Sequence, residues 1–343
     1  MSFSKEKREN IKRYILDKIL ERQDKIVQRT VDAFGITSNT VYRYLRELTN
    51  DGIIEKIGKS YQLVSSEVFH MFLIEEITNY SEDVVFFKYI EPHVQTLPKN
   101  VYMIWYYAFT EMMNNVIDHS EGKHVVVFLK KDFVNTSIII SDDGVGIFNK
   151  IKSHYGFFTL EDAILELFKG KLTTDTKNHS GEGIFFTSRI MDIFAAISDE
   201  KVFSHTEYDE ILQDLKNLPE YDTPIIFISG TTILMKLAND SNKSIENIMN
   251  QYADVDGGFT RTRIPLKNIY PTYPVSRSQA KRLTHRFESF QEIELDFDGI
   301  SEVGQGFAHE LFVVFQNQHK NIKLIHFNAN ISVQRMINHV THD

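Results

Sequence analysis

Cysteine is absent from the 343 residues of this chain. Its absence excludes a disulfide framework, a thiolate nucleophile and a zinc–thiolate site, and it fits a reducing compartment without requiring one. The sequence also lacks an apolar run near the roughly 18 residues that a membrane-spanning helix needs, and its first residues show no signal-peptide pattern. We therefore expect a soluble, cytoplasmic protein that has no membrane partner.

The two common phosphate-binding motifs are missing as well. No GxxxxGK[ST] stretch is present, and none of the GVG, GEG and GQG triplets extends to GxGxxG. These absences exclude a P-loop and a dinucleotide-binding fingerprint. Internal repeats and low-complexity runs are also absent. With 42% hydrophobic residues, the chain is long enough for two or three globular domains.

Charge is distributed unevenly along the chain, whose formal net charge is -9. Residues 1–64 hold 13 Lys and Arg and 9 Asp and Glu, whereas the remaining residues hold 25 basic and 38 acidic ones. A net positive segment on an acidic body suggests that nucleic acid is contacted by the N-terminal module.

The N-terminal module, residues 1–64, is predicted to contain three helices and a hairpin. Apolar residues at helical spacing predict helices over residues 5–21 and 24–34, and a third helix in the stretch SNTVYRYLRELTN. Gly35 stands where the second helix needs a left-handed backbone, and Thr37 or Ser38 supplies an oxygen to cap the third. The alternating stretch IIEKIGKSYQLV predicts a hairpin. This order resembles that of winged helix-turn-helix domains.

The winged-helix resemblance covers residues 25–63 and implies binding to duplex DNA. In that family the third helix enters the major groove. The alternative is a protein-interaction or dimerisation module with a solvated basic face. The implied DNA-binding residues are Ser38, Asn39, Thr40, Tyr42, Arg43 and Arg46 on the third helix, with Lys56 and Lys59 on the hairpin.

Residues 65–97 are expected to connect two domains, with helical periodicity over residues 68–77. His70 lies in this stretch, and a histidine upstream of a nucleotide domain raises the hypothesis of a phospho-accepting residue. Its neighbours Phe69, Met71 and Phe72 favour a packed core or interface histidine instead.

The central segment, residues 98–240, carries polar residues where apolar ones are expected. Residues 101–118 predict one long helix buried on a sheet, yet Glu111, Asn115 and His119 are four residues apart and share one of its faces. Buried polar side chains need partners, and a ligand or hydrated metal is one kind of partner. Two strands follow, HVVVFLKK and TSIIISDDG, then a helix over residues 160–169 and two strands around Gly230.

Glycines accompany these polar residues. Asp142 ends a predicted strand and is followed by Gly144 and Gly146, where the backbone can pass close to a ligand. A further helix begins directly after Gly183, so its first amides can bind an anion.

Together these features resemble the GHKL superfamily, which groups the ATPases of gyrase, a heat-shock chaperone, histidine kinases and mismatch-repair proteins. The resemblance implies an α/β sandwich, with helices on one face of a mixed sheet, that binds ATP and Mg²⁺. Four motifs carry it, in the family's order: Glu111-x3-Asn115-x3-His119, the stretch DDGVG from Asp142 to Gly146, the stretch SGEG from Ser180 to Gly183, and Gly230-Thr231.

The resemblance also implies a role for each residue. Asn115 would bind the magnesium ion shared with the phosphates, and Asp142 would accept a hydrogen bond from the adenine amino group. Gly144 and Gly146 would let the chain turn under the base, and Gly181 and Gly183 would offer backbone amides to the phosphates. The remaining ATP-binding candidates are Gly144, Gly146, Gly181, Gly183, Thr231 and His119, with Lys171, Thr173 and Thr174 on a lid over the phosphates.

Glu111 bears on the question of catalysis. A carboxylate one turn before the magnesium ligand can activate the attacking water as a general base, which permits slow ATP hydrolysis. The alternative is that Glu111 only orients water around the ion. His119 also has a second interpretation, as a cation that suits the end of its helix.

Residues 255–343 alternate strands with helices, which predicts a parallel or mixed sheet covered by helices. The stretches SRSQAKRL, IELDFDGISEVGQGFAHELF and FNANISVQRMI resemble STAS-like domains. In related anti-anti-sigma factors a GHKL kinase phosphorylates a serine, but here Gly304, Gln305 and Gly306 occupy that turn, with Ser301 nearby. We therefore expect a surface for a protein partner or for dimerisation, or a sensor of the ATP-binding domain.

The sequence thus predicts an α/β multidomain regulator that binds ATP and DNA, and in which binding of Mg-ATP, with or without slow hydrolysis, switches the arrangement of its domains. Two alternatives stay open. One is an ATPase or serine protein kinase that acts on a partner protein in the manner of anti-sigma factors. The other is an ATPase effector of stress or antiviral defence.

Overall fold

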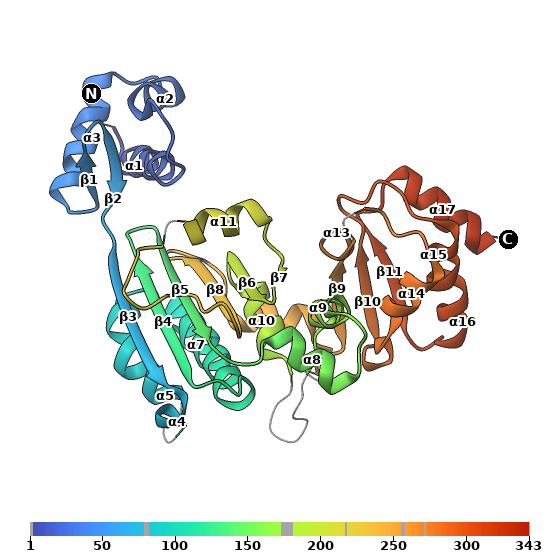
Figure 1. Cartoon of the computed structure of the whole chain (residues 1–343). Coiled ribbons are helices and arrows are strands. Elements are labelled where there is room, and N and C mark those ends of the chain that lie inside the picture. The colour runs from blue at the N-terminus through green and yellow to red at the C-terminus, as the bar shows by residue number, and fades with distance from the viewer. Residues whose placement is uncertain are drawn as a thin grey trace.

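The computed structural model describes residues 3–78, 82–172, 181–216, 218–254, 258–270 and 272–342. Over these residues the chain forms helices and sheets of two, six and three strands, so its class is mixed α/β (Figure 1). Among the helices of the described ranges, none combines the length and apolar character that crossing a lipid bilayer would require.

The N-terminal module has the predicted elements and a core of its own. Gly35 ends the second helix with φ of +61°. Thr37 caps the start of the third helix, because its hydroxyl oxygen accepts a hydrogen bond from the Thr40 amide. Ile11, Ile15 and Tyr44 are fully buried in this core. Its elements are α1 (Lys5–Leu20), α2 (Ile26–Phe34), α3 (Ser38–Asn50) and the antiparallel strands β1 (Ile54–Ile57) and β2 (Ser60–Leu63).

The central sheet has the strand order β3-β4-β5-β8-β6-β7, and every neighbouring pair is antiparallel. The prediction of a mixed sheet was therefore wrong, because strand direction depends on pairing between distant segments and not on the local pattern. The strands are β3 (Ser66–Leu73), β4 (His124–Lys131), β5 (Asn135–Asp142), β6 (Ile193–Ser198), β7 (Lys201–Ser204) and β8 (Thr232–Ala238).

Strand β3 occupies the first part of the predicted connector, residues 65–97. The helical pattern over residues 68–77 is misleading, since only α4 (Ile74–Ile77) is helical there and all eight residues of β3 pair with β4. The His70 ring packs 4.6 Å from the Tyr89 ring, and burial lowers the pKa of His70. Three short elements follow and pack into the core between α7 and the central sheet: α5 (Glu82–Val85), the π-helix η1 (Phe86–Ile90) and α6 (Glu91–Val94).

Both faces of the central sheet are covered, so the expectation of helices on one face alone was wrong. Alternate residues of β4 point to opposite faces: Val125 and Val127 belong to the core under α7, whereas Val126 belongs to the core under α11. The helices around this sheet are α7 (Lys99–His119), α8 (Ile147–Tyr155), α9 (Leu160–Lys169), α10 (Gly183–Ile190), α11 (Tyr208–Lys216) and α12 (Ile245–Tyr252).

Of the two strands predicted around Gly230, only β8 forms. Residues 225–231 have no regular structure, and Ile225 is buried in the core under α11. An apolar run can be buried without pairing as a strand, which its sequence alone does not distinguish.

The C-terminal part is built on a three-stranded parallel sheet, ordered β11-β10-β9, as the alternating pattern predicted. Its core is continuous with that of the central part, since Phe185 and Phe259 share one cluster and their rings lie 4.8 Å apart. The elements are β9 (Arg261–Pro265), α13 (Leu266–Ile269), α14 (Arg277–Thr284), the 3-10 helix η2 (Phe287–Ser289), β10 (Glu292–Asp296), α15 (Gln305–His309), the π-helix η3 (Glu310–Phe315), α16 (Gln316–Gln318), β11 (Lys323–Phe327) and α17 (Ile331–His342).

Candidate functional site

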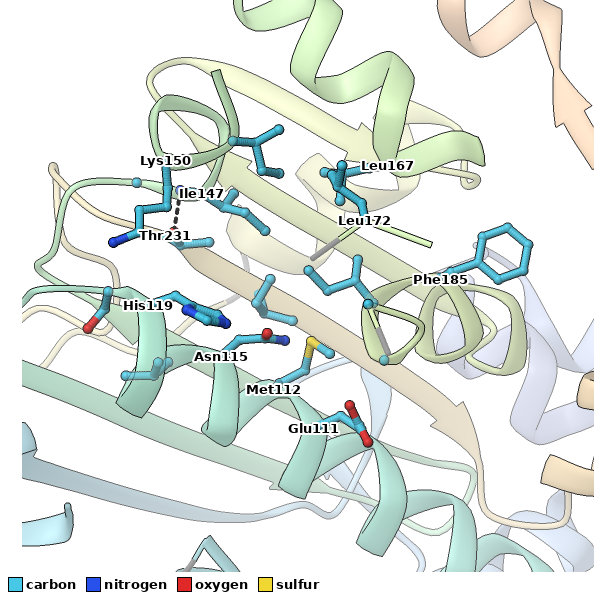
Figure 2. A pocket seen from close by; sticks show the side chains of 18 of the residues that line it. Glu111, Met112, Asn115, His119, Ile147, Lys150, Leu167, Leu172, Phe185 and Thr231 are labelled. Carbon is cyan, nitrogen blue, oxygen red and sulfur yellow. Dashed lines mark hydrogen bonds between the residues drawn. The ribbon is translucent and has the colours of Figure 1, made fainter. Parts of the chain in front are cut away.

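A cavity of about 250 Å³ opens beside α7 (Figure 2). Segments far apart in sequence contribute to it: α7, the end of β5 with α8, the end of α9, the start of α10, and Thr231 before β8. Its lining is amphipathic. The polar side chains are those of Glu111, Asn115, His119, Ser120, Asp142, Lys150 and Thr231, and the apolar ones include Met112, Val116, Ile147, Ile151, Leu167, Leu172, Ile184, Phe185 and Ile233.

Helix α7 places Glu111, Asn115 and His119 in a row along the cavity, as their spacing predicted (Figure 2). The neighbouring faces of α7 are apolar, and Trp105 and Phe109 are fully buried. Packing on the sheet therefore fixes which face of the helix is left for the cavity.

Asp142 forms part of the cavity wall and is only 3% exposed. Its Oδ1 accepts hydrogen bonds from the amides of Gly144 at 2.9 Å and Thr231 at 3.3 Å. Burial raises the pKa of Asp142 to about 6, although these two bonds oppose the shift. Within the described ranges no residue donates to Oδ2, so this oxygen can accept a hydrogen bond from a ligand.

Two glycines let separate backbone segments meet beneath Asp142. A Cβ on Gly144 would lie 2.0 Å from the Ser120 carbonyl oxygen. A Cβ on Gly230 would lie 2.1 Å from the Asp142 carbonyl oxygen, and the φ of Gly230 is +86°, which disfavours other residues. The DDGVG motif and the Gly230-Thr231 motif therefore form the same part of the cavity wall, around Asp142.

The start of α10 lies directly against Glu111. A Cβ on Gly183 would lie 2.0 Å from Glu111 Oε2. The first amides of a helix lack partners within it, and its dipole places partial positive charge there. Gly181, just before this helix, also lines the cavity and accepts a hydrogen bond from the Leu172 amide at 3.1 Å. The cavity thus combines a carboxylate and a helix N-terminus.

Most of the predicted nucleotide-binding residues meet at this cavity. Gly144 adjoins it through its hydrogen bond to Asp142. Lys171 does not line it, because Lys171 Nζ donates to the Ser289 carbonyl oxygen at 2.9 Å. Thr173 and Thr174 lie outside the described residues. The predicted residues that line the cavity are Glu111, Asn115, His119, Asp142, Gly146, Gly181, Gly183 and Thr231.

Sequence reasoning missed Lys150. It lies one turn after Ile147 on α8, lines the cavity and pairs with Glu121. The pattern IFNKIKSHY directly after Gly146 could have revealed this helix, and with it a lysine close to the glycine motif.

The lining suits a ligand that has an apolar part, a hydrogen-bond donor and an anionic part. Asn115 and Glu111 offer an amide oxygen and a carboxylate one turn apart on the same wall. Hard oxygen ligands of this kind suit a magnesium ion that completes its shell with water and phosphate oxygens.

The candidate DNA-binding residues form a separate, exposed surface on the N-terminal module. Val41, Leu45 and Leu48 of α3 are buried, as predicted. Thr40 is half-buried, and its hydroxyl lies 3.0 Å from that of Thr37. The exposed candidates are Ser38, Asn39, Tyr42, Arg43 and Arg46 on α3, and Lys56 and Lys59 on the hairpin.

Comparison with protein families places part of the C-terminal region in a known family. Residues 279–334 match the family described as "STAS-like domain of unknown function (DUF4325)". The matched range includes β10, β11, α15 and the π-helix η3. No curated protein matches the chain. The C-terminal part is therefore STAS-like, as its sequence predicted.

Proposed function

We propose that the cavity binds Mg-ATP in the manner of the GHKL superfamily. The observation that carries the proposal is the meeting of four sequence motifs at one cavity. Residues of α7, the end of β5, the start of α10 and the residue before β8 are far apart in sequence, yet all of them line it. A chance combination of short motifs would not be expected to converge in this way.

The adenine ring would lie among the apolar side chains, with its amino group donating to Asp142 Oδ2. The apolar lining includes Val116, Ile147 and Ile233. Such an arrangement, an apolar pocket with few polar groups that set orientation, is typical of small-molecule sites.

The phosphates would lie towards the start of α10, where Gly181 and Gly183 line the cavity. Asn115 would hold the magnesium ion, which neutralises phosphate charge. Glu111 would orient a water molecule and accept its proton, so slow hydrolysis is part of the proposal.

We further propose that the N-terminal module is a winged helix-turn-helix domain that binds duplex DNA, and that the chain is a cytoplasmic regulator. Only two residues separate β2 from β3, the edge strand of the central sheet. Arg13 of α1 also pairs with Asp240, two residues after β8. These two connections give nucleotide binding a physical route to the orientation of α3.

Calorimetry with Mg-ATP on the full chain tests the proposal. We expect wild-type binding to be saturable and Asn115→Ala to abolish it. Asn114→Ala is the matched control, because Asn114 is on the same helix and does not line the cavity. Absence of binding to wild type would overturn the proposal, and equal binding by both variants would remove the role of Asn115.

A further inference from the structure

The segment at the C-terminal end of α9, residues 169–172, has two sides. Gly170 and Leu172 line the candidate nucleotide cavity. Lys169 and Lys171, which alternate with them, are attached to the STAS-like part by side-chain contacts. One short segment thus contacts both the cavity and the C-terminal part.

The first attachment is a buried ionic cluster around Glu166 of α9, which is 2% exposed. Lys169, 0% exposed, donates to Glu166 Oε1 and to the His285 carbonyl oxygen, each at 2.7 Å. Arg286 Nη1 donates to Glu166 Oε2 at 2.9 Å. Removing one member of such a buried cluster leaves an uncompensated charge, so the cluster holds α9 and residues 285–286 in one arrangement.

The second attachment holds the segment itself. Arg286 Nη2 donates to the Lys171 carbonyl oxygen, and Lys171 Nζ donates to Ser289. The Lys171 ammonium also lies over the rings of Phe259 and Phe290, at 5.4 and 5.0 Å. Lys171 and Arg286 have φ of +53° and +62°, conformations that are unfavourable for these residues unless contacts impose them.

These contacts extend to the end of the cavity at the start of α10, where the phosphates are proposed to lie. The Leu172 amide donates to the Gly181 carbonyl oxygen, and Gly181 precedes α10 by two residues. A displacement of residues 285–289 would therefore move Leu172 in the wall and disturb the glycine stretch beside α10.

We infer that the STAS-like part regulates nucleotide binding in cis, with Arg286 as the positioning residue. When residues 285–289 contact Glu166 and Lys171, they hold Gly170 and Leu172 in the arrangement that binds the nucleotide. A protein that binds the STAS-like part and displaces residues 285–289 weakens nucleotide binding. By linkage, nucleotide binding strengthens the docking by the same factor. The inference rests on the proposed binding of Mg-ATP.

The dissociation constant of Mg-ATP in two arginine variants tests the inference. We expect Arg286→Ala to weaken binding about 10-fold, a coupling of ordinary size. Arg286→Lys should not restore it, since one ammonium cannot reproduce the two guanidinium bonds to Glu166 and Lys171. Arg282→Ala is the matched control, because Arg282 is 55% exposed and its side chain reaches only to 3.9 Å from Asp162. We expect it to bind as wild type does.

Hydrogen exchange on the wild-type chain gives a second test that does not depend on an Arg286 variant. We expect Mg-ATP to slow exchange of the amides of residues 285–290, and not to do so in Asn115→Ala. If wild type binds Mg-ATP but Arg286→Ala binds equally well, or exchange in residues 285–290 is unchanged, the regulatory inference is overturned while the proposed function stands. If wild type does not bind Mg-ATP, the proposed function itself fails.

Discussion

Asp142 and Thr231 are hydrogen-bonded to each other in both directions. The Asp142 amide donates to the Thr231 carbonyl oxygen at 2.9 Å, and the Thr231 amide donates to Asp142 Oδ1 at 3.3 Å. The Thr231 hydroxyl oxygen also accepts a hydrogen bond from the amide of Ile147 at 2.9 Å. This pair therefore joins the end of β5, the start of α8 and the residue before β8 into one wall of the cavity.

Nucleotide binding should depend on pH through Asp142. Burial raises the pKa of this carboxyl to about 6. Because Oδ1 already accepts two amide hydrogen bonds, a proton would lie on Oδ2 and turn this oxygen from an acceptor into a donor. We expect Mg-ATP affinity to fall as the pH is lowered from about 7.5 to about 5, and Asp142→Asn to bind weakly at every pH. Calorimetry across this range measures the effect. A flat profile for wild type would show that Asp142 does not titrate in the nucleotide-free protein.

Asp142 should also affect folding stability, but folding favours the protonated carboxyl whereas nucleotide binding favours the ionised one. Its folded pKa is raised above the ordinary value of 3.8, so the folded state favours protonated Asp142. The stability from this group is fully present below about pH 3.8 and is lost as the pH rises through about 6. Asp142→Asn should therefore raise the free energy of unfolding near pH 8 by up to about 3 kcal/mol. Urea denaturation of both proteins measures this, and lower stability of the variant would contradict it.

Gly183→Ala should impair hydrolysis more than folding. The added Cβ would lie 2.0 Å from Glu111 Oε2, so the Glu111 carboxylate must move away. A flexible side chain can move cheaply, and we expect phosphate release to fall about 10-fold with a loss of unfolding free energy below about 1 kcal/mol. The control is Gly306→Ala, where the nearest atom would be 3.5 Å away. Unchanged turnover in Gly183→Ala would argue against a catalytic position for Glu111.

Glu111→Gln should separate binding from hydrolysis. Glutamine keeps the size of the side chain but cannot accept the proton of the attacking water. We expect phosphate release to fall at least about 100-fold while the dissociation constant of Mg-ATP changes less than about 3-fold. A coupled phosphate assay and calorimetry measure the two quantities. If wild type binds Mg-ATP without releasing phosphate, Glu111 only orients water and the site is a binding switch.

The exposed face of α3 should contact DNA phosphates and bases. We expect Arg43→Ala and Arg46→Ala each to weaken binding to a mixed-sequence duplex, and each lost phosphate contact to reduce the slope of log K against log salt by about 0.9. Arg335→Ala removes the same charge from an exposed position on α17 and should have no effect. Fluorescence anisotropy at several salt concentrations measures this. Absence of DNA binding by wild type would favour the protein-interaction alternative for this module.

Local patterns predicted the elements well where each element depends on its own residues. Gly35 and Thr37 delimit the helices of the N-terminal module as expected, because a left-handed residue and a capping hydroxyl act within one turn. The helical pattern over residues 68–77 was misleading, because Val68–Leu73 belongs to a strand that is stabilised by pairing with β4, more than fifty residues later. The direction of the strands and the packing of α11 on the second face of the sheet were likewise beyond local information.

By itself, the sequence determined which residues of α7 face together, where glycine replaces larger residues, and that the C-terminal part is STAS-like. Helical spacing and the absence of a Cβ are properties of the chain that require no partner. Only the tertiary structure decided that Lys171 is directed to Ser289 and that Arg286 holds the segment beside the cavity. The destination of a long, flexible, charged side chain depends on which acceptors the distant parts of the fold bring within reach.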